Sequence, residues 1–347
     1  MRVSLTTHYS SLITHPFPLM ARSKLRRILE YAATFFLAIS LNFLLPRAMP
    51  GDPLALIAGE AVRQMGAEKI AELRAAYGLD RPLGEQYLLY LGRLAQGDLG
   101  HSYRYSGGKS VAEILADRFV WTFSLVLVGL TLATLLGSLL GAWAAWRHGR
   151  LGDLGLLTAL FAVRSMPSFW VAMLLIPLFA VRWRILPSGD SYSIPRPDGW
   201  EKVTDVVKHA ILPLGVLALS YVPTAFAVMR SSMLNVLGAP YIRTARAKGL
   251  REFAVLYRHA MRNALLPVVT SFGLDFGQLL GGVTLIETVF NYRGLGSMMF
   301  EAVKSRDYPL LQGGFLIFTL GVLFINLLTD WLYPRLDPRL RSVEGGR

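Results

Sequence analysis

The chain offers few of the residue groupings that catalytic or metal sites require. It has no cysteine, which excludes disulfides, thiolate nucleophiles and cysteine-based zinc sites. Its six histidines form no i, i+4 pair and no cluster with metal-ligand spacing, and no GxSxG elbow is present. Gly108-Lys109-Ser110 resembles the end of a phosphate-binding loop, but Tyr103 stands where that motif requires glycine. The sequence therefore does not predict an enzyme.

Two charged residues lie inside long apolar stretches, where a charge at the centre of a membrane helix costs about 2.5–3.5 kcal/mol. Arg164 lies about ten residues into one stretch and Asp275 about eleven into another, so a rise of 1.5 Å per residue places them at similar depths. We expect both, with Pro167 and Gln278, to line a translocation path or gate, where the two charges pair. Alternatively, Arg164 extends to the membrane interface and Asp275 faces water or a partner alone.

A third candidate is the basic segment PYIRTARAKGL, residues 240–250. Pro240 suits the first turn of a short helix and Gly249 suits its C-terminal end. The small residues Ala245, Ala247 and Gly249 would let the surface of another protein approach the backbone closely. A basic helix in a loop is equally suited to anionic lipid.

Composition places these residues in a membrane protein. The chain has 347 residues, of which 53% are hydrophobic and 17% are charged, which is more apolar than a soluble domain of this size requires. The net charge of +13 could indicate a nucleic-acid partner, but the basic residues lie between apolar blocks rather than on one soluble face. A nucleic-acid partner is therefore not expected.

A spanning helix needs about 20 mainly apolar residues, and the chain has six such stretches. They are Ile28 to Leu45, Phe119 to Trp146, Leu154 to Val181, Ala210 to Met229, Ala264 to Thr288 and Leu310 to Trp331. Alternate flanking segments, both termini included, hold five, two, seven and four Lys or Arg residues, and the remaining segments are close to neutral. The positive-inside rule then predicts cytoplasmic N- and C-termini, and an inverted protein would leave the most basic loop outside.

The segment after the first span has a pattern of its own. Residues 67–77 and 83–95 show helical apolar spacing, and Ser110 to Glu113 matches a capping box that would open a third helix. We expect a small periplasmic helical cap, either a packed linker or a docking platform for an external partner. The first span has no cleavage site after it, so we expect it to be retained. The residues before Met20 are expected to form a short N-terminal tail. Alternatively, Met20 is the true start of the protein.

Proline and glycine positions add mechanical expectations. Pro167, Pro213, Pro223 and Pro267 fall in or at the start of helices, where proline produces kinks that serve either as hinges or only for packing. Gly273, Gly277 and Gly281 recur every fourth residue, which favours a contact between helices over a pore lining.

The sequence resembles the dipeptide, oligopeptide and nickel type of ABC importer permease, also described as binding-protein-dependent transport inner-membrane components. The match runs from about residue 24 to 341. The motifs that carry it are GLDRPLGEQY (Gly78 to Tyr87), GDLGHS (Gly97 to Ser102), SMPSFW (Ser165 to Trp170), YIRTARAKGL (Tyr241 to Leu250), RNALLPVVT (Arg262 to Thr270), GGVTLIETVFNYRGLG (Gly281 to Gly296), RDYP (Arg306 to Pro309) and DPRLR (Asp337 to Arg341).

This resemblance implies an all-α membrane protein of six transmembrane helices with the type I ABC importer permease fold. It also implies an ATP-driven importer in the bacterial inner membrane, whose cargo is a peptide or a related small solute such as a nickel chelate. The implied partners are a second homologous permease, two cytoplasmic ATPases, a periplasmic solute-binding protein and the lipid bilayer. No cofactor is expected on this chain, because ATP and magnesium belong to the partner subunits.

The resemblance also assigns a role to the basic loop. Residues 241–250 correspond to the family's cytoplasmic EAA loop, which an ATPase cleft receives. The expected ATPase-coupling residues are Tyr241, Arg243, Thr244, Ala245, Arg246, Ala247, Lys248, Gly249 and Leu250. Three departures from the family pattern are Arg243 in place of the acidic residue, Pro240 where the family often has an acid, and Arg293 in the FNxxGLG turn. The charge pairing of other transporters therefore does not transfer to this chain.

The expected organisation combines these assignments. A cytoplasmic segment 1–27 precedes the first transmembrane helix at 28–46 and the cap at 47–118. A five-helix core follows at 119–331, with its coupling loop at 230–263, and a cytoplasmic tail occupies 332–347. A secondary transporter would show inverted repeats, and the sequence has no convincing repeat. A membrane-embedded enzyme would need a polar cluster at membrane depth.

Overall fold

The computed structural model describes residues 24–48, 54, 66–76, 79–102 and 109–336. Within these residues the protein is mainly helical, as predicted. The helices are α1 (Lys24–Ala48), α3 (Ala67–Ala76), α4 (Leu83–Ala95), α6 (Val111–Trp146), α7 (Leu151–Arg164), α8 (Ser168–Ile176), η2 (Pro177–Arg182), α9 (Gly199–Leu237), α10 (Pro240–Ala247), α11 (Glu252–Ala254), η3 (Val255–Ala260), α12 (Met261–Gly282), α13 (Thr284–Val289), α14 (Leu295–Ser305) and α15 (Tyr308–Leu336). Two short antiparallel strands, β1 (His101–Ser102) and β2 (Lys109–Ser110), precede α6.

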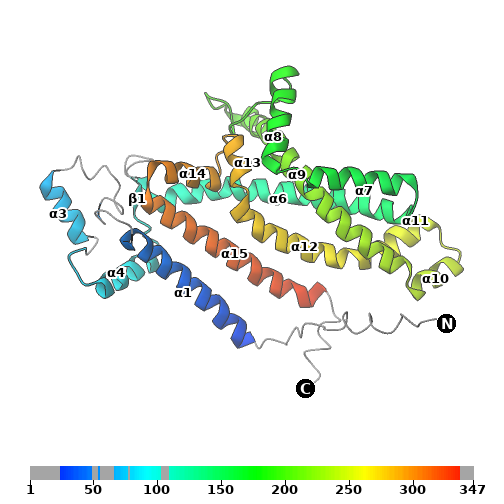
Figure 1. Ribbon diagram of the computed structural model, residues 1–347, viewed down its shortest axis with the longest axis horizontal. Helices are drawn as coiled ribbons and strands as arrows, with labels where there is room; N and C mark the ends of the chain where they lie inside the picture. The colour runs from blue at the N-terminus through cyan, green and yellow to red at the C-terminus, as the bar shows by residue number, and fades with distance from the viewer. Residues whose placement is uncertain (1–23, 49–53, 55–65, 77–78, 103–108, 337–347) are drawn as a thin grey trace, which may run out of the picture.

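The centre of the molecule is the pair α6 and α9, which run in the same direction (Figure 1). Glycines on α6 let the two backbones approach, because a Cβ atom at Gly137 would lie 2.7 Å from the Val222 carbonyl oxygen. At Gly141 a Cβ atom would likewise lie 2.7 Å from the Phe226 carbonyl oxygen. α12 packs against α6, α9 and α15, and α1 lies along the outer side of α15.

Within the described part of the chain, three helices are long and apolar enough to cross a membrane: α6, α9 and α15 over Tyr308–Thr329. A fourth crossing is possible if α7 and the segment Ser168–Arg182 act as one span, although they meet at a bend of 95°. The apolar part of α1 is shorter, at Ile28–Leu44. The membrane-length helices thus agree with four of the six predicted stretches, one of them in bent form.

The third predicted span is bent, as expected for Pro167, and the angle between its two parts is 95°. Pro167 is the N-cap of α8, and the chain turns sharply between the end of α7 at Arg164 and that point. Proline donates no backbone N–H and disfavours the helical conformation in the residue before it, so a break at this position has a local cause. Pro213, Pro223 and Pro267 instead lie inside continuous helices.

In the cap, helices begin at all three predicted positions, but the third is longer than expected. The predicted helices at 67–77 and 83–95 are α3 and α4. The predicted third helix is not separate, because α6 starts at Val111 and continues into the second span, and the N-cap residue Ser110 makes no side-chain capping bond. The C-terminal end of the cap segment is therefore the first part of a membrane helix.

Several sequence expectations lie outside the described residues. They concern the N-terminal segment 1–23, most of the segment after the first span (49–53 and 55–65), Tyr103, Gly108 and the DPRLR motif at 337–341. For the glycine series of α12, a Cβ at Gly273 would lie 2.8 Å from Thr329 Oγ1 and one at Gly277 would lie 3.4 Å from Ile325, both on α15. The expected helix contact is confirmed for these two positions.

Candidate functional site

The predicted coupling segment forms α10, which stands at one end of the bundle, opposite the cap (Figure 1). Pro240 occupies its first turn, as its fixed φ angle favours. Ile242 and Ala245 are buried and pack in an apolar cluster with Met229 and Met233 of α9. The helix is thus attached to the bundle by one narrow apolar face.

The other face of α10 is exposed and basic. Outward-facing residues are Tyr241, Arg243, Thr244, Arg246, Ala247 and Lys248. The expectation that Ala245, Ala247 and Gly249 jointly offer a small-residue surface was wrong in one respect, because Ala245 faces the bundle. At 3.6 residues per turn Ala245 shares a face with Ile242, whereas Ala247 lies on the opposite side.

The turn after α10 depends on Gly249 and on one ion pair. Gly249 has φ of +76°, a left-handed conformation that favours glycine, and a Cβ atom there would meet nothing within 4 Å. Arg246 Nε donates to Glu252 Oε1 at 2.9 Å, which ties the end of α10 to α11. Leu250 follows the turn and is exposed.

Two further contacts connect the coupling loop to the spanning helices. Asn263 Nδ2, in the first turn of α12, donates to the Tyr241 hydroxyl at 2.8 Å. The apolar cluster beneath α10 also includes Ala142 and Ala145 of α6 and Val255 and Leu256 of η3. Displacement of α10 would therefore act on α6, α9 and α12 together.

A buried ion pair joins the first turn of α7 to α9, near the end of the bundle that carries α10. Arg230 Nε donates to Asp153 Oδ1 at 2.6 Å and its Nη2 donates to Oδ2 at 2.7 Å, the two-pronged geometry of a strong pair. The Gly149 amide donates to Asp153 Oδ2 at 3.1 Å, and His148 Nδ1 lies 3.2 Å from that oxygen. Asp153 is fully buried. We call these four residues the Asp153–Arg230 clasp.

The four residues predicted for a path or gate do not form one cluster of contacts. Arg164, Pro167 and Gln278 are exposed and Asp275 is half-buried. Arg164 and Asp275 are close enough for a long-range electrostatic interaction, but no ion pair joins these two described residues. Asp275 instead accepts from Ser271 Oγ, one turn earlier, at 3.3 Å. The break before Pro167 removes the straight helix on which the equal-depth argument rested.

Further from α10, toward the cap, a buried carboxylate fixes the turn between α13 and α14. Glu287 is fully buried and accepts from Thr122 Oγ1 at 2.6 Å and from the Ser297 amide at 3.0 Å. Thr122 Oγ1 in turn accepts from the Leu295 amide at 2.7 Å. A Cβ atom on Gly294 would overlap the Glu287 carboxylate, which explains the glycine. α6 and the start of α14 are joined through this carboxylate.

Arg293 extends the same connection to the surface. Its Nη2 donates to Asp117 Oδ2 at 2.9 Å and its Nη1 donates to the Tyr192 hydroxyl at 3.2 Å. The Arg293 amide donates to Ser191 Oγ at 2.8 Å, so the loop before α9 is fastened to the α13–α14 turn. A cavity of about 250 Å³ lies here, lined by residues that include Arg118 and Glu301.

Sequence reasoning missed Asp153, Arg230, Thr122 and Glu287. Asp153 was visible as an isolated acid in a basic cytoplasmic segment, and Glu287 as an acid at the end of an apolar stretch. Their partners lie 77 and 165 residues away in the chain. No local pattern connects residues at such separations.

Two family models match the chain. Residues 137–342 match the binding-protein-dependent transport system inner membrane component, and residues 20–126 match the N-terminal region of such membrane components. Between them these matches include the α10 loop, the clasp, Thr122 and the buried Glu287.

Curated relatives match over nearly their whole length. The dipeptide transport system permease protein of Escherichia coli strain K12 is 39% identical over 338 residues, covering 92% of this chain and 98% of that protein. The di/tripeptide transport system permease protein of Pseudomonas aeruginosa is 39% identical, covering 91% and 97%. The glutathione transport system permease protein of Pectobacterium atrosepticum is 38% identical, covering 91% and 98%.

Proposed function

The chain belongs to the family of binding-protein-dependent transport system inner membrane components, and from this premise we propose the system in which it works. It is a permease subunit of an ABC importer and not an enzyme. We infer that its cargo is a short peptide, because the relatives named above are permeases for dipeptides, tripeptides and glutathione.

The proposed assembly contains a second homologous permease, two cytoplasmic ATPases and an external solute-binding protein. The family description supports the binding protein. The exposed basic face of α10 supports an ATPase partner, because it would complement an acidic cleft. ATP and magnesium would bind to the ATPases rather than to this chain.

We place six spans in the inner membrane. Four of them are α6, α9, α15 and the bent pair of α7 with Ser168–Arg182. The other two are α1, whose apolar part is short, and α12, which lies beside α15. The basic α10 loop and the Asp153–Arg230 clasp are on the cytoplasmic side, and the cap is on the periplasmic side.

The proposed coupling mechanism rests on the contacts that attach α10 to the other helices. One narrow apolar face attaches it to α6, α9 and η3, and Tyr241 attaches it to α12. An ATPase that moves α10 therefore pushes three long helices at once, rather than one flexible loop. This arrangement couples ATP hydrolysis to the opening of the permease.

The test is a bulky residue at Gly249 and a matched one at Gly97. Both glycines have nearly the same left-handed φ, +76° and +75°, and both have nothing within 4 Å of a built Cβ atom. The strain of substitution is therefore similar, but Gly249 adjoins α10 and Gly97 lies in the turn after α4, at the other end of the molecule. Gly249→Trp should detach the ATPases or abolish dipeptide uptake while membrane insertion persists. Equal uptake by both variants would contradict the coupling role.

The peptide cargo is tested separately. A deletion strain complemented with this chain and its partners should regain uptake of a radiolabelled dipeptide, and unlabelled dipeptide should compete. Uptake that is unchanged by the deletion would exclude dipeptides as the cargo without affecting the assignment as a permease.

A further inference from the structure

The cap helix α4 lies beside the last part of the first span, not beyond it. The apolar part of α1 is Ile28–Leu44. The Tyr87 hydroxyl of α4 lies 2.7 Å from Ser40 Oγ, which is four residues before the end of that part, about 6 Å at the rise of a helix. The rings of Tyr87 and Tyr90 pack 5.1 and 5.6 Å from the ring of Phe43. α4 is therefore at the depth where the hydrocarbon core meets the headgroups.

The outer face of α4 is apolar although it has no protein partner among the described residues. Leu88 is 68% exposed and Leu89 is 39% exposed, while Gln86 on the inner face is buried. α1, on which α4 rests, exposes Leu41 and Leu44 to the same surroundings. An amphipathic helix at this depth places its apolar side in the boundary between headgroups and acyl chains.

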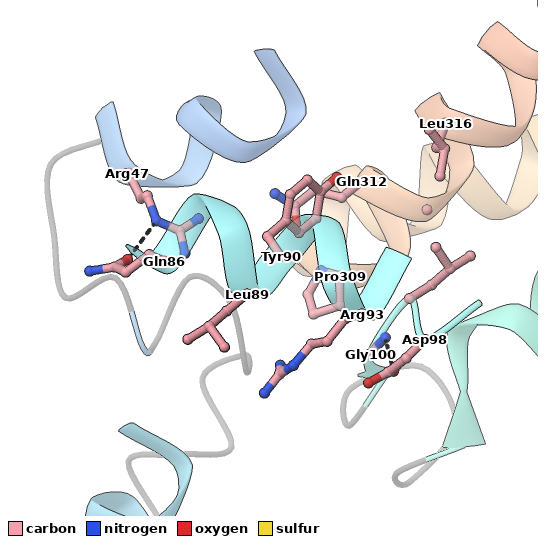
Figure 2. Close-up of a pocket in the computed structure, with 12 residues that line it drawn as sticks. Arg47, Gln86, Leu89, Tyr90, Arg93, Asp98, Gly100, Pro309, Gln312 and Leu316 are labelled. Atoms are coloured by element: carbon pink, nitrogen blue, oxygen red, sulfur yellow. Dashed lines mark hydrogen bonds between the residues drawn. The ribbon is translucent and has the colours of Figure 1, made fainter. Parts of the chain in front are cut away.

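A pocket beside α4 has the chemistry of a headgroup site (Figure 2). It lies between α1, α4 and α15 and has a volume of about 60 Å³. Its lining combines arginines with apolar side chains: Arg47, Arg93, Leu89, Leu99, Pro309 and Leu316. Asp98 also lines it, and its carboxylate accepts from the Gly100 amide at 2.9 Å.

Protein contacts fix the side chain of Arg47, and the remaining N–H donors of its guanidinium can bind an anion. Its Nε donates to Gln86 Oε1 and its Nη1 donates to the Phe43 carbonyl, each at 2.9 Å, and its guanidinium lies 3.7 Å from the centre of the Phe43 ring. A guanidinium has five N–H donors, and described residues accept from two of them. Arginine stays protonated in proteins, so Arg47 carries its positive charge at neutral pH.

We propose that α4 lies in the headgroup layer of the outer leaflet and that the Arg47–Arg93 pocket binds the phosphate of a phospholipid there. The apolar residues Leu89, Leu99 and Leu316 would contact the glycerol and the first acyl carbons. The cap is then anchored to the bilayer as well as to α1. This inference goes beyond the proposed function and takes from it only the side of the membrane on which the cap lies.

Lipid binding is measured on the purified importer complex by titration with dihexanoyl phosphatidylglycerol, a phospholipid with short chains. Arg47→Gln should weaken binding about tenfold, because hydrogen bonds between charged groups are the strong ones. The control is Arg81→Gln, since Arg81 is a half-exposed residue of the same cap outside the pocket lining. Absence of binding to the wild type, or equal weakening by both variants, would overturn the proposal. Inorganic phosphate that binds as tightly as the lipid would also overturn it.

The depth of α4 in the membrane is measured with labels at residues that do not line the pocket. The natural chain has no cysteine, so single cysteines can carry a fluorophore in proteoliposomes of phosphatidylethanolamine and phosphatidylglycerol. A label at Leu88→Cys should be quenched by lipids with a nitroxide in the headgroup, and a label at Glu72→Cys on α3 by a water-soluble quencher only. Equal aqueous quenching at both positions would overturn the interfacial placement. Depth is independent of which side the cap occupies, so an error in the proposed orientation would be distinguishable.

Discussion

At the scale of single residues, the charges that matter most structurally are those with buried partners. Asp153 has no exposed surface and receives two hydrogen bonds from Arg230. Arg246 and Glu252 form a pair in the same region, but their side chains are 42% and 47% exposed. Removal of one partner from a buried pair leaves an uncompensated charge, whereas an exposed pair contributes little.

We therefore predict different costs for two neutralising substitutions. Arg230→Gln should destabilise the permease by about 3–5 kcal/mol, because it strands the buried Asp153 carboxylate. Arg246→Gln should cost about 1 kcal/mol or less, because its pair is solvated. Thermal unfolding of the purified complex in detergent measures both. Equal melting temperatures for the two variants would show that the clasp contributes no more than a surface pair.

Arg164 and Asp275 pose a different question, since they interact without touching in this structure. Transport requires more than one conformation, and the two charges pair in one of the others if they belong to a gate. Arg164→Gln and Asp275→Asn should each impair peptide uptake, and the exchange of both charges should restore part of it. Normal uptake by both neutral variants would show that neither residue belongs to a gate.

At the scale of helices, the contact between α6 and α9 determines how rigid the centre is. The two backbones meet at Gly137, where a Cβ atom would lie 2.6 Å from Ala225 Cβ. Such a contact leaves no room for a side chain, so the two helices pack backbone against backbone. α10 follows α9 in the chain, so this close contact continues toward the coupling loop.

A valine at Gly137 should separate the two helices. Overpacking of this kind costs about 1–3 kcal/mol. Gly215 on α9 has nothing within 4 Å of a built Cβ atom and is the matched control. Gly137→Val should lower the melting temperature and the uptake rate, and Gly215→Val should change neither by as much. Similar effects at both positions would mean that backbone proximity is not what Gly137 provides.

The helices and their limits were predictable where a local cause determines them. The bounds of α4 followed from apolar spacing, and the turn after α10 followed from Gly249. The bend at Pro167 was predicted as a kink, but its size depends on how α8 packs on α9 and α13. The burial of Ala245 follows from the position of α10 on the bundle, which the loop sequence alone does not contain.

At the scale of the whole molecule, the cap and the coupling loop lie at opposite ends of the bundle (Figure 1). The predicted path residues lie between them and are largely exposed on this single chain. In the proposed assembly a second permease would face this exposed surface, and the two subunits together would enclose the path.

The orientation predicts a labelling pattern with a reagent that does not cross membranes. In spheroplasts, Glu72→Cys on the cap should react with an impermeant maleimide, and Lys248→Cys after α10 should react only after permeabilisation. Both side chains are exposed, so access rather than burial decides the result. The reverse pattern would mean that the chain is inverted and that the positive-inside count is misleading.

The unbroken length of α6 has a consequence for how this protein can vary. The helix has 36 residues, which corresponds to about 54 Å, well beyond a hydrocarbon core of about 30 Å. About a third of the way along the helix Thr122 meets Glu287, and near its end Gly141 meets Phe226. One inserted residue between them would rotate one contact away from the other by about 100°. Relatives that differ in length should therefore gain or lose residues in loops, whereas the number of residues in α6 should stay constant.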